Sequence, residues 1–182
     1  MLNIDTAALW QPTLTGSRIL LRPLAQTDFE VLYSAASEPL IWEQHPDRYR
    51  YKREGFQAYF QSGLESKGAL VVIDLQSGEM IGSSRFRDHK VQESSIEIGY
   101  TFLTRQYWGK GYNEELKRLM LDHAFQFVDT VFFVVGLDNH RSRRALLKIG
   151  AVEREAIAIS PVPVQTDVRC SVTYRMTKSA WE

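Results

Sequence analysis

The sequence has no excess of charge of either sign and almost no cysteine. Its 22 Lys and Arg residues balance 22 Asp and Glu residues. This balance argues against a general nucleic-acid or anionic-membrane binder and leaves room only for a local anion site. The one cysteine, Cys170, cannot form an intramolecular disulfide. A reducing cytoplasm is therefore the expected compartment.

Long hydrophobic runs are also absent. The longest, such as residues 131–135, are far too short to cross a bilayer, and residues 1–16 have no basic start of the kind a signal peptide needs. No Gly/Ser linker, low-complexity tract or repeat divides the chain, so we expect one domain over residues 1–182. With 44% hydrophobic and 12% aromatic residues, the chain can form a substantial core, which argues against disorder.

Several metal and catalytic signatures are missing as well. The four histidines show no metal-ligand spacing, and one cysteine cannot complete a zinc set, so we predict no metal site. No Gly-x-Ser-x-Gly elbow of a serine hydrolase is present. Cys170 falls on the apolar side of a predicted strand with no paired base, which favours an inert buried thiol.

The pattern of apolar residues predicts strands and helices in alternation. The expected strands are 18–22, 69–74, 80–86, 95–103, 131–135, 155–159 and 168–176. The expected helices are 28–37, one that carries Phe56, Tyr59, Phe60 and Leu64, 112–128, and 140–149. This order predicts an α/β fold: a central mixed, twisted sheet of about seven strands with helices on both faces.

Strand 95–103 alternates strictly, which assigns its side chains to two faces. Ile96, Ile98, Tyr100 and Phe102 are expected on one face, and Glu97, Gly99 and Thr101 on the other. The continuous apolar run 131–135 is typical of a strand covered on both faces. In the last strand the residues expected to share a face are Val168, Cys170, Val172, Tyr174 and Met176.

Local signals mark the ends of the predicted helices. Thr27 and Glu30 have the spacing of a capping box at the start of helix 28–37. Asn139 is a favourable N-cap for helix 140–149, and Gly150 is a natural stop for it.

Segment 106–112 contains two glycines, Gly109 and Gly111, directly before a predicted helix. Such a turn can point several backbone amides outward where the helix contributes its positive end, which suits a phosphate or pyrophosphate. An ordinary strand-to-helix turn explains the two glycines equally well. If an anion binds here, the carboxylates of Glu114 and Glu115 should point away from it.

Three segments together resemble the GCN5-related N-acetyltransferase (GNAT) superfamily. They are Ile96-Glu97-Ile98-Gly99-Tyr100, the motif Gln106-x-x-Gly109-x-Gly111, and the pair Asn139-x-x-Ser142. More narrowly, they are similar to the branch that includes the ribosomal-protein N-terminal acetyltransferases (RimJ/RimL-like). The similarity extends from residues 18–23 to the final strand and Trp181.

The resemblance implies that acetyl-CoA binds as co-substrate. Its pyrophosphate would rest on backbone amides of residues 106–113, and its pantetheine arm would pair with the end of strand 95–103, between the splayed fourth and fifth strands. The cofactor-binding residues implied in this way are Phe102, Leu103, Thr104, Gln106, Tyr107, Trp108, Gly109, Lys110, Gly111, Tyr112 and Asn113.

Direct attack on the thioester requires a neutral amine. Roughly a tenth of an α-amine is neutral at pH 7, against less than about a thousandth of a lysine side chain. We assign Glu97 as general base, acting through a water; a solvent-facing strand glutamate is the alternative. The resemblance implies that Asn139 and Ser142 stand near the sulfur, where Ser142 donates a hydrogen bond. Asn139 is equally explained as a helix cap.

The resemblance implies that the acceptor is a primary amine, and its identity stays open between a peptide or protein N-terminus, an aminoglycoside and a polyamine. By analogy with relatives, the acceptor cleft is framed by loop 161–165 and by segment 41–51 with Trp42, His45, Tyr49 and Tyr51. Arg141, Arg143, Arg144 and Lys148 form a basic group that either meets cofactor phosphates or is a solvated helix face.

The other class of function is a CoA-responsive regulatory module without efficient catalysis. A homodimer is compatible with the aromatic content, as is a purely internal use of the same residues.

Overall fold

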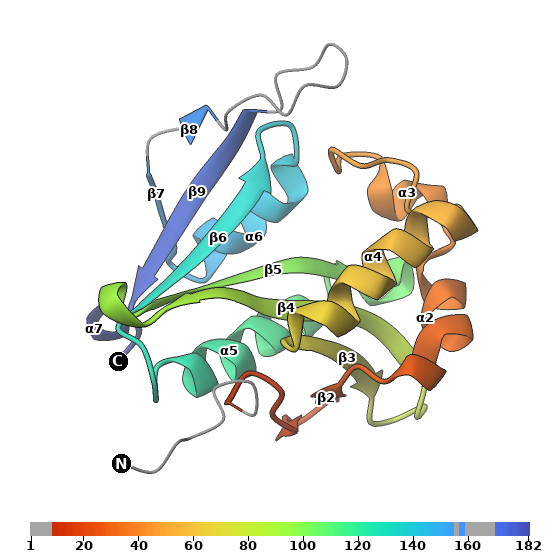
Figure 1. Cartoon of the computed structure of the whole chain (residues 1–182), viewed down its shortest axis with the longest axis horizontal. Helices are drawn as coiled ribbons and strands as arrows, with labels where there is room; N and C mark the ends of the chain where they lie inside the picture. Colours follow the sequence, from red (N-terminus) through yellow and green to blue (C-terminus); the bar gives the residue numbers. More distant parts are fainter. Residues whose placement is uncertain (1–8, 155–156, 159–169) are drawn as a thin grey trace.

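The computed structural model describes residues 9–154, 157–158 and 170–182. These residues form a nine-stranded mixed sheet in the order β1-β2-β3-β4-β5-β6-β9-β7, with β8 paired to β9 (Figure 1). The strands are β1 (Leu14–Thr15), β2 (Ile19–Pro23), β3 (Ala69–Asp74), β4 (Met80–Lys90), β5 (Ser95–Leu103), β6 (Thr130–Gly136), β7 (Val152–Glu153), β8 (Ile157–Ala158) and β9 (Cys170–Thr177). The predicted fold class is confirmed. The two strands beyond the predicted seven, β1 and β7, have only two residues each, too few to leave a periodic signal.

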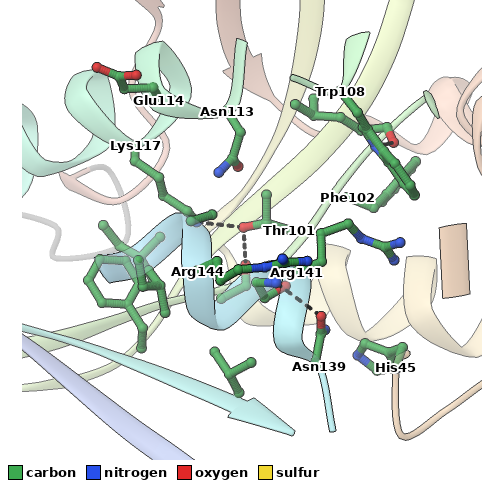
Figure 2. Close-up of a pocket in the computed structure, with 18 of the residues that line it drawn as sticks. His45, Thr101, Phe102, Trp108, Asn113, Glu114, Lys117, Asn139, Arg141 and Arg144 are labelled. Atoms are coloured by element: carbon green, nitrogen blue, oxygen red, sulfur yellow. Dashed lines mark hydrogen bonds between the residues drawn. The ribbon is translucent and has the colours of Figure 1, made fainter. Parts of the chain in front are cut away.

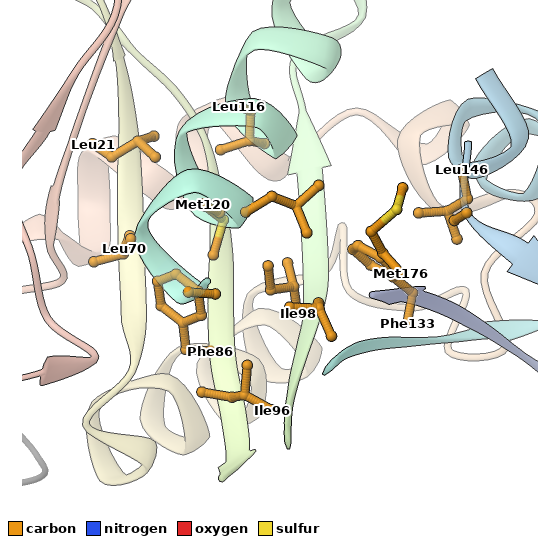
Figure 3. Packing of buried hydrophobic residues seen from close by; sticks show 14 of the residues in the cluster. Leu21, Leu70, Phe86, Ile96, Ile98, Leu116, Met120, Phe133, Leu146 and Met176 are labelled. Atoms are coloured by element: carbon orange, nitrogen blue, oxygen red, sulfur yellow. The ribbon is translucent and has the colours of Figure 1, made fainter. Parts of the chain in front are cut away.

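Helices cover both faces of the sheet (Figure 1). They are α2 (Phe29–Ala36), α3 (Pro39–Trp42), α4 (Arg53–Ser66), α5 (Tyr112–Ala124), α6 (His140–Lys148) and α7 (Lys178–Trp181), with short 3-10 turns η1 (Gln26–Asp28), η2 (Val91–Glu93) and η3 (Arg105–Tyr107). Leu32 of α2 and Phe56 of α4 belong to one core cluster. Met120 of α5 and Leu146 of α6 belong to the other, on the opposite face (Figure 3).

The predicted capping box at the first helix is wrong. A 3-10 turn precedes α2, and the carboxylate of Asp28, not the side chain of Thr27, accepts a local backbone amide, that of Ala25, at 2.8 Å. The same carboxylate receives two hydrogen bonds of 2.8 Å from the guanidinium of Arg22. Glu30 instead pairs with Arg53 of α4. A charged partner outside the helix therefore overrides the local capping pattern.

Other local predictions are confirmed. The side chain of Asn139 accepts the amide of Ser142 and caps α6, and Gly150 ends that helix region with a φ of 84°. In β9, Val172, Tyr174 and Met176 are all buried. Val168, the side chain of Cys170 and loop 161–165 lie outside the described residues.

A β-bulge at Tyr100 interrupts the alternation predicted for β5. Tyr100 has a left-handed φ of 53°, and the β4–β5 register moves from Arg85 opposite Gly99 to Ser83 opposite Phe102. Ile98 therefore faces the α5 side, whereas Phe102 belongs to the α4 side. The prediction that the even-numbered residues share one face is wrong beyond residue 99, because one extra residue shifts the phase of the strand.

Strands β5 and β6 separate soon after they meet. They pair in parallel only through Ser95–Glu97 and Thr130–Phe132, and beyond these residues they diverge (Figure 1). In β6, Phe133 is buried but Val134 is 39% exposed. The prediction that 131–135 is covered on both faces is thus wrong, because the separation of the strands opens one side of β6.

Candidate active site

The separation of β5 and β6 produces a cavity of about 680 Å³. Its lining comes from β5, β6, the segment before α5, the first turns of α5, α6, and the region of α3. The two ends of the lining differ in character. Ile98 and Phe133 are buried where the strands part, whereas Arg144 of α6 is exposed. Figure 2 shows Arg141 and Arg144 among the residues that line the cavity.

The cavity brings together part of the predicted site. From the predicted set, its lining includes Phe102, Leu103, Tyr107, Trp108, Gly109, Gly111, Asn113, Asn139 and Ser142. Glu97, Thr104, Gln106, Lys110 and Tyr112 are outside that lining. Gln106, Lys110 and Tyr112, together with Tyr107, line a second, shallower pocket beside Asp74.

The turn before α5 depends on its two glycines. Gly109 has a φ of 72° and Gly111 a φ of 83°, values that other residues adopt only at a cost. Gly111 occupies the N-cap position of α5, and no side chain caps the amides of this helix turn. Uncapped amides at the positive end of a helix are donors suited to an anionic oxygen. The turn therefore combines positive-φ glycines with uncapped amides, features that suit an anion.

Arg18 binds both the carboxylate of Glu115 and the backbone of the turn. The backbone amide and Nε of Arg18 donate to the two carboxylate oxygens of Glu115 at 2.8 and 2.9 Å, and Nη1 of Arg18 donates to the carbonyl of Lys110 at 2.6 Å. These bonds, with burial opposing them, hold the pKa of Glu115 below its ordinary value. Glu114 is exposed, and its carboxylate points away from the other labelled side chains (Figure 2). The orientation of the two acids relative to a bound anion stays a prediction.

Arg18 is a site residue that the sequence analysis did not identify. It lies more than ninety positions before the turn, so local sequence contains no sign of the contact. Its position at the start of the first predicted strand was the only signal available.

The end of β5 is fixed by bonds inside the protein. The indole Nε1 of Trp108 donates to the carbonyl of Leu103 at 2.8 Å, and the amide of Thr104 donates to the carbonyl of Ile81 at 2.8 Å. Arg141 of α6 covers the ring of Trp108, with its guanidinium carbon 4.0 Å from the ring centre. These contacts join the turn, β5 and α6 around one cavity wall.

Asn139 and Ser142 lie together at the start of α6. The Asn139 side-chain oxygen accepts the Ser142 amide at 3.1 Å. Arg141, in the same helix turn, contacts the region of α3. Its amide donates to the side chain of Gln44, and its guanidinium donates to the carbonyl of Ile41 at 3.1 Å. Helix α6 is thereby connected to the region of α3.

Glu97 is not among the residues that line the cavity, but its carboxylate lies beside Gly99, which is: Oε1 of Glu97 is 3.0 Å from the position a Cβ on Gly99 would take. Its side chain is 15% exposed, and one carboxylate oxygen is 3.9 Å from Nε of Arg87. Burial raises the pKa of Glu97 above its ordinary value, although the positive charge of Arg87 opposes this. A carboxylate with a raised pKa is a better match to a protonated amine than an ordinary surface glutamate.

The basic group of α6 divides between two environments. Arg141, Arg144 and Lys148 line the cavity. Arg143 instead turns toward β9, where its Nε donates to the hydroxyl of Tyr174 at 3.0 Å. In the segment 41–51, Trp42 and His45 line the cavity, whereas Tyr49 is 65% exposed.

Lys117 is the second residue that the sequence analysis did not identify. It comes from α5, is 5% exposed, and donates from Nζ to the hydroxyl of Thr101 at 2.7 Å (Figure 2). Burial lowers its pKa to about 7. A charged residue in a helix usually lies on the solvated face. The burial of Lys117 could therefore not be predicted from the sequence.

Within the described residues, no group of His, Cys, Asp and Glu side chains has the arrangement of a metal site. The same residues include no helix long and apolar enough to span a membrane.

Comparison with solved structures identifies the fold. A GCN5-related N-acetyltransferase from Brucella melitensis superposes with a TM-score of 0.83 at 20% identity, covering 94% of this chain and 80% of that one. Mycobacterium smegmatis RimJ in complex with CoA-disulfide gives a TM-score of 0.69 at 18% identity, covering 94% and 90%. Identities this low establish likeness of fold alone.

Sequence comparison gives a shorter match and a family. The protein YkkB of Bacillus subtilis is 32% identical over 84 residues, 44% of this chain, and the match spans 48% of that relative's length. The family model described as an acetyltransferase (GNAT) domain matches residues 18–152. That range includes the paired strands, the glycine turn and the Asn139–Ser142 cap, and the chain belongs to the GNAT acetyltransferase family.

Proposed function

We propose that the protein is an N-acetyltransferase that transfers the acetyl group of acetyl-CoA directly to a primary amine. The observation that carries the proposal is the turn 106–111: two glycines at positive φ lead into the uncapped start of α5 beside the β5–β6 cavity. Family membership supports the same donor, since the family is one of acetyltransferases.

The chain offers groups suited to each part of the donor. Backbone amides of residues 106–113 would hold the diphosphate. Phe102 and Leu103 border the cavity that would receive the pantetheine arm, and Asn139 and Ser142 line the same cavity from α6. When bound, the thioester supplies an activated acyl group with a thiolate leaving group.

Proton transfer is assigned to two side chains. Glu97 accepts the proton of the acceptor amine through a water, because its carboxylate is not among the residues that line the cavity. Its raised pKa makes it a stronger base than an ordinary glutamate. The hydroxyl of Ser142 donates a hydrogen bond to the departing sulfur.

The charges of the cavity favour an acceptor with a single amine over a polycation. Lys117, Arg141, Arg144 and Lys148 line it, and among its described lining residues Glu114 is the only carboxylate. Several positive charges on a polyamine or aminoglycoside would be repelled by this surface. A peptide or protein N-terminus is the acceptor class we propose, in keeping with the RimJ among the similar structures.

The test is a calorimetric titration with acetyl-CoA followed by a screen for released thiol. The screen compares peptides with a free N-terminus, the same peptides with a blocked N-terminus, polyamines and aminoglycosides. We expect binding of acetyl-CoA and thiol release with free N-termini only. Binding without turnover on any amine would favour a CoA-responsive regulatory module, and absence of binding would reject both functions.

A further inference from the structure

Lys117 places an ammonium group inside the cavity without an acidic partner. Its side chain is buried, lines the cavity and points toward β5 (Figure 2). Among the described residues, its one hydrogen bond is to the hydroxyl of Thr101, at 2.7 Å, and no carboxylate pairs with it. Thr101 in turn lies 2.7 Å from the hydroxyl of Ser84. An ammonium has three donors, so two remain for another ligand.

A buried cation without a counter-charge is costly, and proteins rarely keep one on packing grounds alone. Leucine or methionine would fill the same helix position without that cost. The position of Lys117 on α5, between buried Leu116 and the exposed Arg118, gives no structural reason for a charge. A ligand that carries a negative charge into the cavity would explain why a cation occupies this position.

The neighbours of Lys117 define where that charge would lie. Its Nζ is 5.5 Å from the ring centre of Phe133, and Ile98 and Phe133 are the buried residues that follow the last β5–β6 pairs. The cation therefore lies beside the apolar residues at which the two strands part. Methylene groups fit against such walls, and a carboxylate at the end of a short chain would reach the ammonium.

We propose that Lys117 binds the distal carboxylate of a dicarboxylic acyl group, so that the cavity accepts CoA thioesters of the succinyl class as well as acetyl-CoA. The proposal rests on the proposed function in taking this cavity as the site of a CoA thioester. It adds the donor class and the residue that selects it.

The phosphates of CoA are the competing anions. They are assigned to the turn 106–111 and the first amides of α5, whereas Lys117 lies a full turn further along that helix and is bonded to Thr101, near the end of β5. If Lys117 bound a phosphate, its removal would weaken CoA itself. If it bound a carboxylate of the acceptor, thioester affinity would not depend on it.

The test compares the affinities of CoA, butyryl-CoA and succinyl-CoA by calorimetry. Butyryl and succinyl chains are of similar length and differ in the distal carboxylate. The variants are Lys117→Met, which keeps the unbranched shape without the charge, and Arg118→Met, which removes a cation from the exposed side of the same helix. Thermal melting confirms that each variant is folded.

We expect the wild type and Arg118→Met to bind succinyl-CoA at least about tenfold more tightly than butyryl-CoA, the scale of a charge-assisted hydrogen bond. Lys117→Met should reverse this order while leaving CoA affinity unchanged. Equal wild-type affinity for the two thioesters would overturn the inference even if Lys117→Met did not fold, and so would a loss of CoA affinity in that variant. Those results leave the acetyltransferase proposal standing, whereas failure of every thioester to bind would reject both.

Discussion

The side-chain oxygen of Asn139 accepts the backbone amide of Ser142 at 3.1 Å, so one residue both caps α6 and lines the cavity. The cap fixes the position of Ser142, which we assign to the departing sulfur. Helix stability and catalysis are therefore linked at this residue, and variants of different capping strength separate them.

Asn139→Ala should lower the free energy of unfolding by about 1 kcal/mol, because the Ser142 amide loses its partner. Asn139→Ser should keep the stability near that of the wild type, because serine is an equally good cap. Urea unfolding and acetyl-transfer rates are measured for both. Full activity in a stable Asn139→Ser variant would limit Asn139 to capping, and full stability of Asn139→Ala would refute the cap itself.

Glu97→Gln should lower turnover below pH 8, with partial recovery at higher pH as the amine loses its proton unaided. The physical reason is that the carboxylate, whose pKa is raised by burial, is the proposed proton acceptor. The matched control is Glu93→Gln in η2, whose exposed side chain contacts Lys90. The rate is recorded across pH for each protein, and a Glu97→Gln profile parallel to that of the wild type would remove this residue from its role.

Lys117→Met should raise the free energy of unfolding, and more so at pH 6 than at pH 9. In the folded protein burial lowers the pKa of Lys117 to about 7 from 10.5. Between these values the unfolded chain binds more protons, so wild-type stability rises with pH by up to roughly 1.4 kcal/mol per unit, a rise that methionine removes. Urea unfolding at both pH values measures the difference, with Arg118→Met as control. The same difference at pH 6 and pH 9 would contradict the lowered pKa of Lys117.

Much of the fold could be predicted from local sequence patterns, because long-range contacts do not change the structure of these segments. The alternation of β9, the periodicity of α4 and the punctuation of α6 by Asn139 and Gly150 each depend on residues close in sequence. The glycine turn is likewise local, since Gly109 and Gly111 adopt the positive φ that their residue type permits.

The parts of the site that sequence did not predict depend on long-range contacts or on an unusual backbone. Tyr100 gives no sign of its left-handed φ, yet the bulge there moves Thr101 to the α5 side, where it meets Lys117. Arg18 contacts Glu115, which is 97 positions later in the sequence. Such contacts emerge only once the sheet has formed.

The central claim, that the turn 106–111 binds the diphosphate of acetyl-CoA, is tested most directly by titrating acetyl-CoA into two matched glycine variants. Gly109 and Gly78 have φ values of 72° and 74°, and neither has an atom within 4 Å of the position a Cβ would take. Gly109→Val and Gly78→Val should therefore lose similar stability. We expect Gly109→Val to bind acetyl-CoA at least about tenfold more weakly than the wild type, with Gly78→Val unchanged. Wild-type affinity in a folded Gly109→Val protein would contradict the account.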